Sequence, residues 1–284
     1  MNARDLAERL HLDHYPRSWR GTCPCCGYQR AFRLWTSKNY PVRVFCANGC
    51  DRDALADTIR QVAGGEALPP GHADDGEVQA ARDRKQAAAQ RLWNGSTPAP
   101  GTIVQAYLVS RGLSDLAASP TLRFRGDCPH PEGGRLPAMI AQVVDVAGKL
   151  TAVHRTYLRP DGTGKAEVEP AKASLGPVWG GAIRLHDAAA ELVIGEGIET
   201  SASAGLLLNL PAWAAISAGN LGRGLVLPPI VQMVVIAVDA DPPGEAAARQ
   251  AASRWRTEGR QVRIARPDHA GADFNDVIRE AQHG

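Results

Sequence analysis

Short apolar runs followed by helix-like spacing dominate the last third of the chain, over residues 191–284. Apolar runs of about four to eight residues, bounded by Gly and Pro, are typical of buried parallel strands. The pattern predicts strands at 192–195, 212–217, 232–238 and 261–265, and helices at 196–208, 243–258 and 274–281. We therefore predict a parallel α/β sheet with helices on both of its faces.

The first two thirds of the chain show different patterns. Strict alternation predicts a hairpin of strands at 31–36 and 42–46, and strands at 121–125, 138–146 and 150–158. Helical spacing occurs at 3–10, 53–62, 77–93 and 102–111, and we interpret 77–93 as a solvated connector. The Gly-, Pro- and Asp-rich stretch 64–77 reads as a linker. We expect domains at 1–63, 78–187 and 188–284.

Six cysteines occur in the chain, and four of them are spaced as metal ligands. Cys23 and Cys26 form a C-x-x-C pair followed by Gly, and Cys46 and Cys50 form a second, wider pair. Two such pairs are the usual layout of a four-thiolate zinc ribbon, in which the metal is structural because no coordination position stays open. Three alternatives stay open for single ligands: Cys25, His11 and His14.

The predicted hairpin between the cysteine pairs has two different faces. Phe32 and Leu34 share the face that we expect in the core, and the other face carries Arg33 and Trp35, with Arg43 on the partner strand. Aromatic rings beside arginines suit the stacked bases and phosphates of single-stranded nucleic acid. The alternative is a small ribbon core with solvated arginines.

Acidic residues follow two of the strands predicted in the carboxy-terminal domain. Glu196 comes after the first strand, and Asp239 and Asp241 come after the third. If these strands are neighbours, three carboxylates meet at one edge of the sheet, where ligands of open α/β sheets collect. Crowded carboxylates need a cation to neutralise them, and their hard oxygen atoms suit Mg²⁺.

Three segments in this order resemble the signature segments of the Toprim domain: GEGIE at 195–199, VDADPPG at 238–244 and DFND at 273–276. The family includes bacterial-type DNA primases, topoisomerases and some nucleases. The resemblance implies a Mg²⁺ site for chemistry on phosphate esters. Glu196 would be the acid/base glutamate, Asp239 and Asp241 the metal-binding pair, and Asp273 a further magnesium ligand. Glu199 and Asp276 match the family less closely.

The regions before this domain resemble other parts of bacterial and phage-type primases. The cysteine region is similar to their zinc-binding domain, and residues 78–187 are similar to the amino-terminal half of their catalytic core. The fold class implied is a Toprim-type parallel α/β sheet preceded by an α+β primase core half and an amino-terminal zinc ribbon. That resemblance assigns nucleotide phosphates or template to four cations: Arg155, Lys172, Lys165 and Arg184.

Charge is distributed unevenly along the chain. Residues 1–50 hold eight Lys or Arg against three Asp or Glu, whereas residues 191–284 hold eight against eleven. A basic amino-terminal region and an acidic carboxy-terminal region fit a protein that contacts a polyanion through the first and binds cations through the second. The amino terminus lacks the apolar core of a signal peptide and no apolar run reaches membrane-spanning length, so we expect a cytoplasmic protein with reduced cysteines.

We therefore expect a DNA primase, from a mobile element or phage-like locus, that joins nucleotides into primers on single-stranded DNA. Its cofactors would be structural Zn²⁺ and catalytic Mg²⁺ or Mn²⁺, its substrates NTPs, and its partner a separate replicative helicase. Two alternatives remain: a Toprim nuclease, and a non-catalytic DNA-binding accessory protein. A topoisomerase fragment is disfavoured because none of the five tyrosines lies in a recognisable DNA-gate domain.

Overall fold

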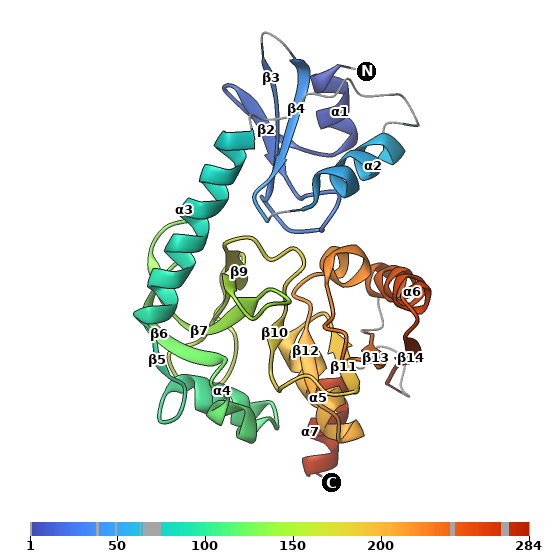
Figure 1. Cartoon of the computed structure of the whole chain (residues 1–284). Helices are drawn as coiled ribbons and strands as arrows, with labels where there is room; N and C mark the ends of the chain where they lie inside the picture. Colours follow the sequence, from blue (N-terminus) through green and yellow to red (C-terminus); the bar gives the residue numbers. More distant parts are fainter. Residues whose placement is uncertain are drawn as a thin grey trace.

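The structure is a computed structural model that describes residues 2–37, 40–48, 50–62, 64, 75–238, 242–267 and 273–283. Three sheets follow one another along the chain, with four, five and five strands. Figure 1 shows the first sheet at one end of the molecule, with α3 running from it along the second sheet and the third sheet lying beside the second.

The amino-terminal region is an antiparallel ribbon with the strand order β1-β2-β3-β4. Its elements are α1 (Ala3–Arg9), β1 (Asp13–Tyr15), β2 (Ser18–Gly21), β3 (Phe32–Ser37), β4 (Tyr40–Cys46) and α2 (Arg52–Val62). Phe32 and Leu34 are fully buried against Leu6 and Ile59 from the two helices. The core face predicted for the hairpin is therefore confirmed.

The second region is an antiparallel sheet with the strand order β5-β6-β7-β8-β9. Its elements are α3 (Asp75–Asn94), β5 (Thr97–Pro98), α4 (Ile103–Ser110), η1 (Ser114–Ala118), β6 (Leu122–Pro129), β7 (Arg135–Val144), β8 (Leu150–Tyr157) and β9 (Lys172–Leu175). Successive residues of β8 face opposite ways: Val153 and Tyr157 pack under α3, whereas Ala152 packs in the core shared with the third region.

Helix α3 differs from the solvated connector that the sequence suggested. Ala89 and Trp93 are buried against the second sheet, and Gln86 donates a hydrogen bond to the Leu150 carbonyl. At its other end Arg82 donates to the carbonyl of Cys50 at 3.3 Å. The interpretation as a connector was wrong because a narrow stripe of Ala and one Trp suffices to bury a helix among many charges.

The third region is the predicted α/β sheet, with the strand order β10-β12-β11-β13-β14. Its elements are β10 (Ile183–Arg184), β11 (Glu191–Gly195), α5 (Ile198–Leu208), β12 (Ala212–Ala214), η2 (Asn220–Gly224), β13 (Met233–Ala237), α6 (Pro242–Thr257), β14 (Gln261–Ala265) and α7 (Phe274–His283). The four strands after β10 are parallel to one another, and β10 pairs antiparallel with β12. The predicted fold class is confirmed.

Helices cover both faces of this sheet, because its strands alternate between two cores. Leu192 and Ile194 of β11 lie in the cluster that contains Trp255 of α6, and Val193 lies in the cluster that contains Ile198 of α5 and Phe274 of α7. The strand register places Gly195 beside Ala237, so the carboxyl ends of β11 and β13 are neighbours. The condition on which the predicted acidic edge depends is therefore met by the backbone.

The ribbon packs directly on the other two regions. The Asn48 carbonyl accepts hydrogen bonds from the main-chain N–H groups of Val178 and Trp179, at 3.0 and 3.2 Å. Arg223 of η2 donates to the carbonyl of Cys25. Gly219 lies so close to the same turn that a Cβ atom there would overlap the Cys25 carbonyl and the Cys26 Cα.

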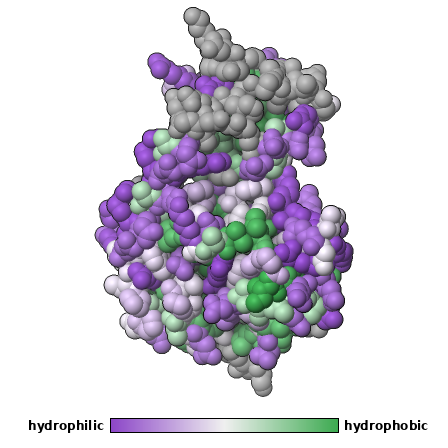
Figure 2. Space-filling model, viewed as in Figure 1, coloured by the Kyte–Doolittle hydropathy of each residue, from purple (hydrophilic) through white to green (hydrophobic). Residues whose placement is uncertain are grey.

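No described helix is long and apolar enough to cross a membrane. Figure 2 shows that polar residues predominate on the face viewed, with apolar residues gathered near its centre.

Candidate active site

The four cysteines selected by their spacing lie together in the ribbon. Their sulfur atoms all lie within 4.8 Å of one another, and all four residues are buried: Cys23, Cys26, Cys46 and Cys50. Gly27 adopts a φ of 69°, and its N–H donates to the Cys23 carbonyl, so the chain turns back over the cluster. Four converging thiolates fit a closed tetrahedral zinc site. Within the described residues, Cys25, His11 and His14 do not belong to this group.

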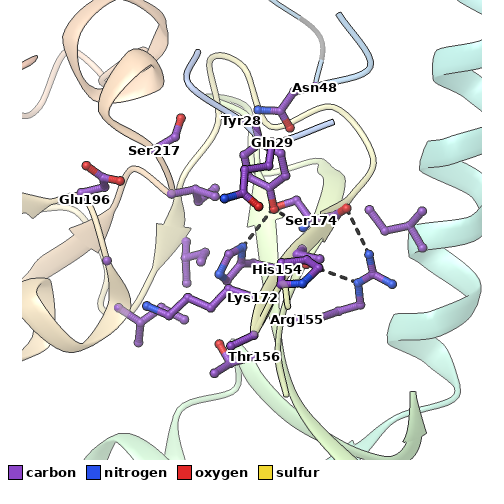
Figure 3. Close-up of a pocket in the computed structure, with 18 of the residues that line it drawn as sticks. Tyr28, Gln29, Asn48, His154, Arg155, Thr156, Lys172, Ser174, Glu196 and Ser217 are labelled. Carbon is purple, nitrogen blue, oxygen red and sulfur yellow. Dashed lines mark hydrogen bonds between the residues drawn. The ribbon is translucent and has the colours of Figure 1, made fainter. Parts of the chain in front are cut away.

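A cavity of about 670 Å³ opens where the three regions meet. Its wall is formed by the ribbon, by β8, β9 and the loop between them, and by the carboxyl ends of β11 and β12 with the start of α5. Figure 3 shows Tyr28, Gln29 and Asn48 on one side of the cavity, with Lys172 across from them and Glu196 at the edge of the third sheet. Ligands of open α/β sheets bind outside the carboxyl ends of the strands, where this cavity lies.

Two of the predicted magnesium ligands line this cavity: Glu196, directly after β11, and Asp273, directly before α7. One oxygen of Asp273 accepts the N–H of Asp276 at 2.8 Å, and Asp276 in turn accepts the N–H of Asp273 at 3.2 Å. This reciprocal cap explains part of the DFND pattern as the start of a helix. Asp239 and Asp241 lie outside the described residues.

Two of the predicted cations, Lys165 and Lys172, meet inside the cavity on a carboxylate that we did not select. The ammonium groups lie 3.1 and 3.5 Å from the two oxygens of Glu199, which is only 8% exposed. The hydroxyl of Tyr107, on α4, donates to the same carboxylate at 2.5 Å. Burial alone would raise the pKa of Glu199, but the two lysines and the hydroxyl outweigh it and hold this pKa well below its usual range.

Burial and charge act differently on the other titratable groups of the cavity. The Glu199 carboxylate raises the pKa of Lys172, whereas burial is the main cause that lowers the pKa of Lys165. Burial, with the nearby Lys172, lowers the pKa of His154 to about 3. His154 is therefore neutral at pH 7, and one of its ring nitrogens lies 3.0 Å from the Ser174 hydroxyl.

Arg155 also lines the cavity, but its guanidinium is occupied by main-chain carbonyls. It donates to Pro129 at 2.9 Å, to Ser174 at 3.2 Å and to Ala173 at 3.3 Å. We had assigned Arg155 to phosphates or template. Three of its five N–H groups hold β8, β9 and the end of β6 together, and its assignment to phosphates or template stays a prediction.

Arg184 is not among the residues that line the cavity. It donates to the carbonyls of Asp145 and Val146 at 2.7 and 3.0 Å, and its guanidinium lies 4.4 Å from the centre of the Trp213 ring. The side chain therefore joins the second sheet to the third, and its assignment to nucleotide or template stays a prediction.

The basic and aromatic face of the ribbon forms as expected. The guanidiniums of Arg33 and Arg43 lie 5.0 and 5.4 Å from the centre of the Trp35 ring, from two neighbouring strands. None of the three lines the cavity. This surface is therefore a separate candidate contact for nucleic acid, on the same domain that forms one wall of the cavity.

The ribbon wall connects the cysteine cluster to the cavity. Asn48 lines the cavity, and its side-chain amide donates to the sulfur of Cys26 at 3.6 Å. The Tyr28 hydroxyl accepts the main-chain N–H of Ser174, on the strand that carries Lys172. We missed these contacts, together with Lys85 of α3, which also lines the cavity, because each joins residues far apart in the sequence.

Comparison with known proteins gave two family matches. Residues 83–185 match a domain of unknown function (DUF7146), and residues 191–283 match the Toprim domain. No curated protein matches the chain.

Several solved structures are similar in fold. A DNA primase domain from Pseudomonas aeruginosa matches 69% of this chain and 74% of its own, with 16% identity and a TM-score of 0.45. The zinc-binding and RNA polymerase domains of Aquifex aeolicus primase match 99% and 80%, with 16% identity and a TM-score of 0.44. The primase fragment of the bacteriophage T7 primase-helicase protein matches 93% and 95%, with 12% identity and a TM-score of 0.44.

Proposed function

We propose that this chain is a primase-type nucleotidyltransferase, because residues 191–283 match the Toprim domain. It joins nucleotides into short primers on a single-stranded DNA template, and it requires Mg²⁺ or Mn²⁺. The reaction is attack of a 3′-hydroxyl on the α-phosphate of the incoming nucleotide.

One observation carries the proposal: a single cavity collects Glu196, Asp273, two lysines and a wall of the zinc ribbon. A polymerising site needs oxygen ligands for metal ions, cations for the triphosphate and a contact to the template within reach of one another. A volume of about 670 Å³ lies within the range of small-molecule and cofactor sites, roughly 300–1,000 Å³.

The acidic residues fit a divalent cation by their chemistry. Glu196 and Asp273 offer carboxylate oxygens to the cavity, and Asp239 and Asp241 follow the neighbouring strand in the sequence. These four residues would hold Mg²⁺, which supplies charge for the developing pyrophosphate and lowers the pKa of the attacking hydroxyl. Glu196 stands where it can also accept a proton.

The remaining residues of the proposed site bind and orient the nucleotide and the template. Lys165 and Lys172 hold the phosphates, since their ammonium groups face the same cavity as Glu196. The Arg33, Trp35 and Arg43 face binds the template strand by stacking and by charge. The four-cysteine cluster, loaded with zinc, keeps the ribbon folded and holds Tyr28 and Asn48 in the cavity wall.

Primer synthesis on single-stranded DNA with NTPs and Mg²⁺ tests the proposal. We expect labelled products from the wild-type chain and none from Asp239→Ala. Equal activity of the two proteins would refute the assignment.

The same assay separates the alternatives. Shortening of labelled single strands in Mn²⁺ without NTPs, and no extension when NTPs are added, would identify a nuclease. DNA binding with neither extension nor shortening of the strand, in Mg²⁺ or in Mn²⁺, would identify a non-catalytic accessory protein. A separate helicase partner belongs to the same proposal, and stimulation of primer synthesis on adding a replicative helicase tests it.

A further inference from the structure

Glu199 is a buried acid that the proposed chemistry does not use. It lies in the first turn of α5, three residues after Glu196, and only 11% of its side chain is exposed. Burying a carboxylate is costly unless cations and donors compensate for the lost water. Three side chains of the second region supply such compensation: Tyr107, Lys165 and Lys172.

Each of the two lysines contacts a different oxygen of the Glu199 carboxylate. Oxygen Oε1 is 3.1 Å from Nζ of Lys165 and also accepts the Tyr107 hydroxyl, while Oε2 is 3.5 Å from Nζ of Lys172. An ammonium group has three donors, so each lysine keeps donors for a second partner after it binds Glu199. Both lysine side chains remain about one third exposed, at 31% and 37%, and both line the cavity.

Tyr107, which donates to the carboxylate, is itself fixed by contacts of α4 with its neighbours. Tyr107 is fully buried on α4, and the guanidinium of Arg111, one turn later, lies 5.4 Å from the centre of its ring. The carbonyl of Arg111 accepts the side-chain amide of Asn275 at 2.7 Å, and the same amide contacts Ser203 of α5 at 3.1 Å. Helix α4 is thereby fixed to α5 and α7, and the pair of Tyr107 and Glu199 cannot shift without disturbing both.

We propose that Glu199, fixed by Tyr107, is a positioning residue that holds Lys165 and Lys172 as a two-ammonium clamp for the polyphosphate of a nucleoside triphosphate. This inference rests on the function proposed above. Lysine side chains have many rotamers, and ordering them on binding costs conformational entropy. When the lysines are already ordered in the free protein, that cost no longer weakens ligand binding. Glu199 also neutralises one of the two ammonium charges, which allows both lysines to occupy one small space.

A merely electrostatic role predicts the opposite result. If Glu199 only reduced the positive charge of the cavity, replacing it with a neutral amide would tighten the binding of an anion. The sign of the change in affinity therefore separates positioning from charge balance.

The test is calorimetric titration of the full chain with a non-hydrolysable adenosine triphosphate analogue and Mg²⁺, which requires no primer synthesis. We expect Glu199→Gln to weaken binding about tenfold, the loss typical of one charge-assisted hydrogen bond, and Tyr107→Phe to weaken it about threefold. In a Lys172→Gln background, Glu199→Gln should weaken binding less than it does alone, because part of its action passes through that lysine.

Glu258→Gln is the matched control, since Glu258 also bridges two cations, Arg254 and Arg260, and does not line the cavity. Its affinity should equal that of the wild type. If Glu199→Gln fails to fold, as judged by near-ultraviolet circular dichroism, Tyr107→Phe decides the question, because it removes one hydroxyl and keeps the charge.

Unchanged or tighter binding in Glu199→Gln, or in Tyr107→Phe where that variant decides, overturns the inference. Weaker binding with full additivity in the Lys172→Gln background also overturns it, since the effect would then not pass through the lysine. A wild-type chain that binds the analogue but makes no primers refutes the proposed polymerase, while the loss of affinity in Glu199→Gln still supports the clamp.

Discussion

The two candidate metal sites of this chain differ in how they are built. The cysteine cluster is closed: four buried thiols within one ribbon surround a single point. The acidic edge is open, because Glu196 and Asp273 come from separate elements and face a cavity that two other domains complete. A closed set holds a metal for stability, whereas an open set leaves coordination positions for a substrate.

The difference also concerns what each site depends on. The thiol cluster needs only a hairpin and two turns, so it can form as soon as the ribbon folds. The open site needs the register of β11 and β13, the lysines of the second region and the docked ribbon. We therefore expect substitutions at the closed site to change stability and substitutions at the open site to change activity.

The largest expected effect is loss of the closed site. Cys46→Ser should abolish zinc binding and unfold the ribbon, because structural zinc sites contribute apparent free energies of about 10–16 kcal/mol. Zinc content by atomic emission and protection of the first 60 or so residues from trypsin measure this. Cys25→Ser is the control and should retain its zinc; if Cys46→Ser retains zinc equally well, the ligand set is wrong.

The second effect concerns the open site and should leave stability alone. Glu196→Gln should lower the rate of primer synthesis by about 10²–10⁴-fold, the usual contribution of a general acid or base. Its melting temperature and zinc content should match the wild type. Glu245→Gln, which removes a half-buried partner of Arg266 that does not line the cavity, should keep full activity. Comparable rates in Glu196→Gln and wild type would remove Glu196 from the chemistry.

The third effect tests the electrostatics of the cavity through pH. The folded pKa of His154 lies near 3, below its ordinary value, so the folded state disfavours the proton that the unfolded state accepts. The contribution to stability is complete above about pH 6.5 and falls as the pH drops toward 3, by up to about 1.4 kcal/mol per pH unit. Urea unfolding between pH 7 and 5 should show this slope.

The control for this slope is a second histidine. His154→Asn should flatten the dependence, and His14→Asn, which changes an exposed residue, should leave it as in the wild type. A slope that persists unchanged in His154→Asn would assign it to other groups.

The smallest expected effect lies on the outer face of the ribbon. Trp35→Ala should weaken the binding of single-stranded DNA by about 1–3 kcal/mol, the value of one stacked base. Fluorescence anisotropy with a labelled oligonucleotide measures the change, and Leu207→Ala, an exposed residue of α5, is the control. Equal affinities of Trp35→Ala and wild type would mean that this face does not bind the template.

Much of the fold follows from periodicity in the sequence. The parallel strands, the hairpin of β7 and β8 and the two faces of β8 were predictable because each depends on neighbours in the sequence or on a repeat of two. The strand β12 is shorter than predicted and ends at Ala214. Ile216 follows with a φ of 77°, a conformation that apolar patterning does not reveal for a β-branched residue.

The site was predictable in residue type but less in role. Lys165, Lys172 and Arg155 line the cavity, whereas Arg184 donates to main-chain carbonyls after β7 and is not among the lining residues. Sequence cannot distinguish these outcomes, because they depend on which carbonyl lies opposite each guanidinium after folding. Glu199 was noted as a weaker family match within GEGIE, but its role was not predictable because its partner Tyr107 lies 92 positions away.

The close approach of Gly219 to the turn at Cys25 and Cys26 closes one path across the boundary between the ribbon and the third region. Main chain meets main chain there, with no room for even one methyl group. No chain can pass between the ribbon and this loop, so a nucleotide strand bound as proposed would have to enter the cavity elsewhere.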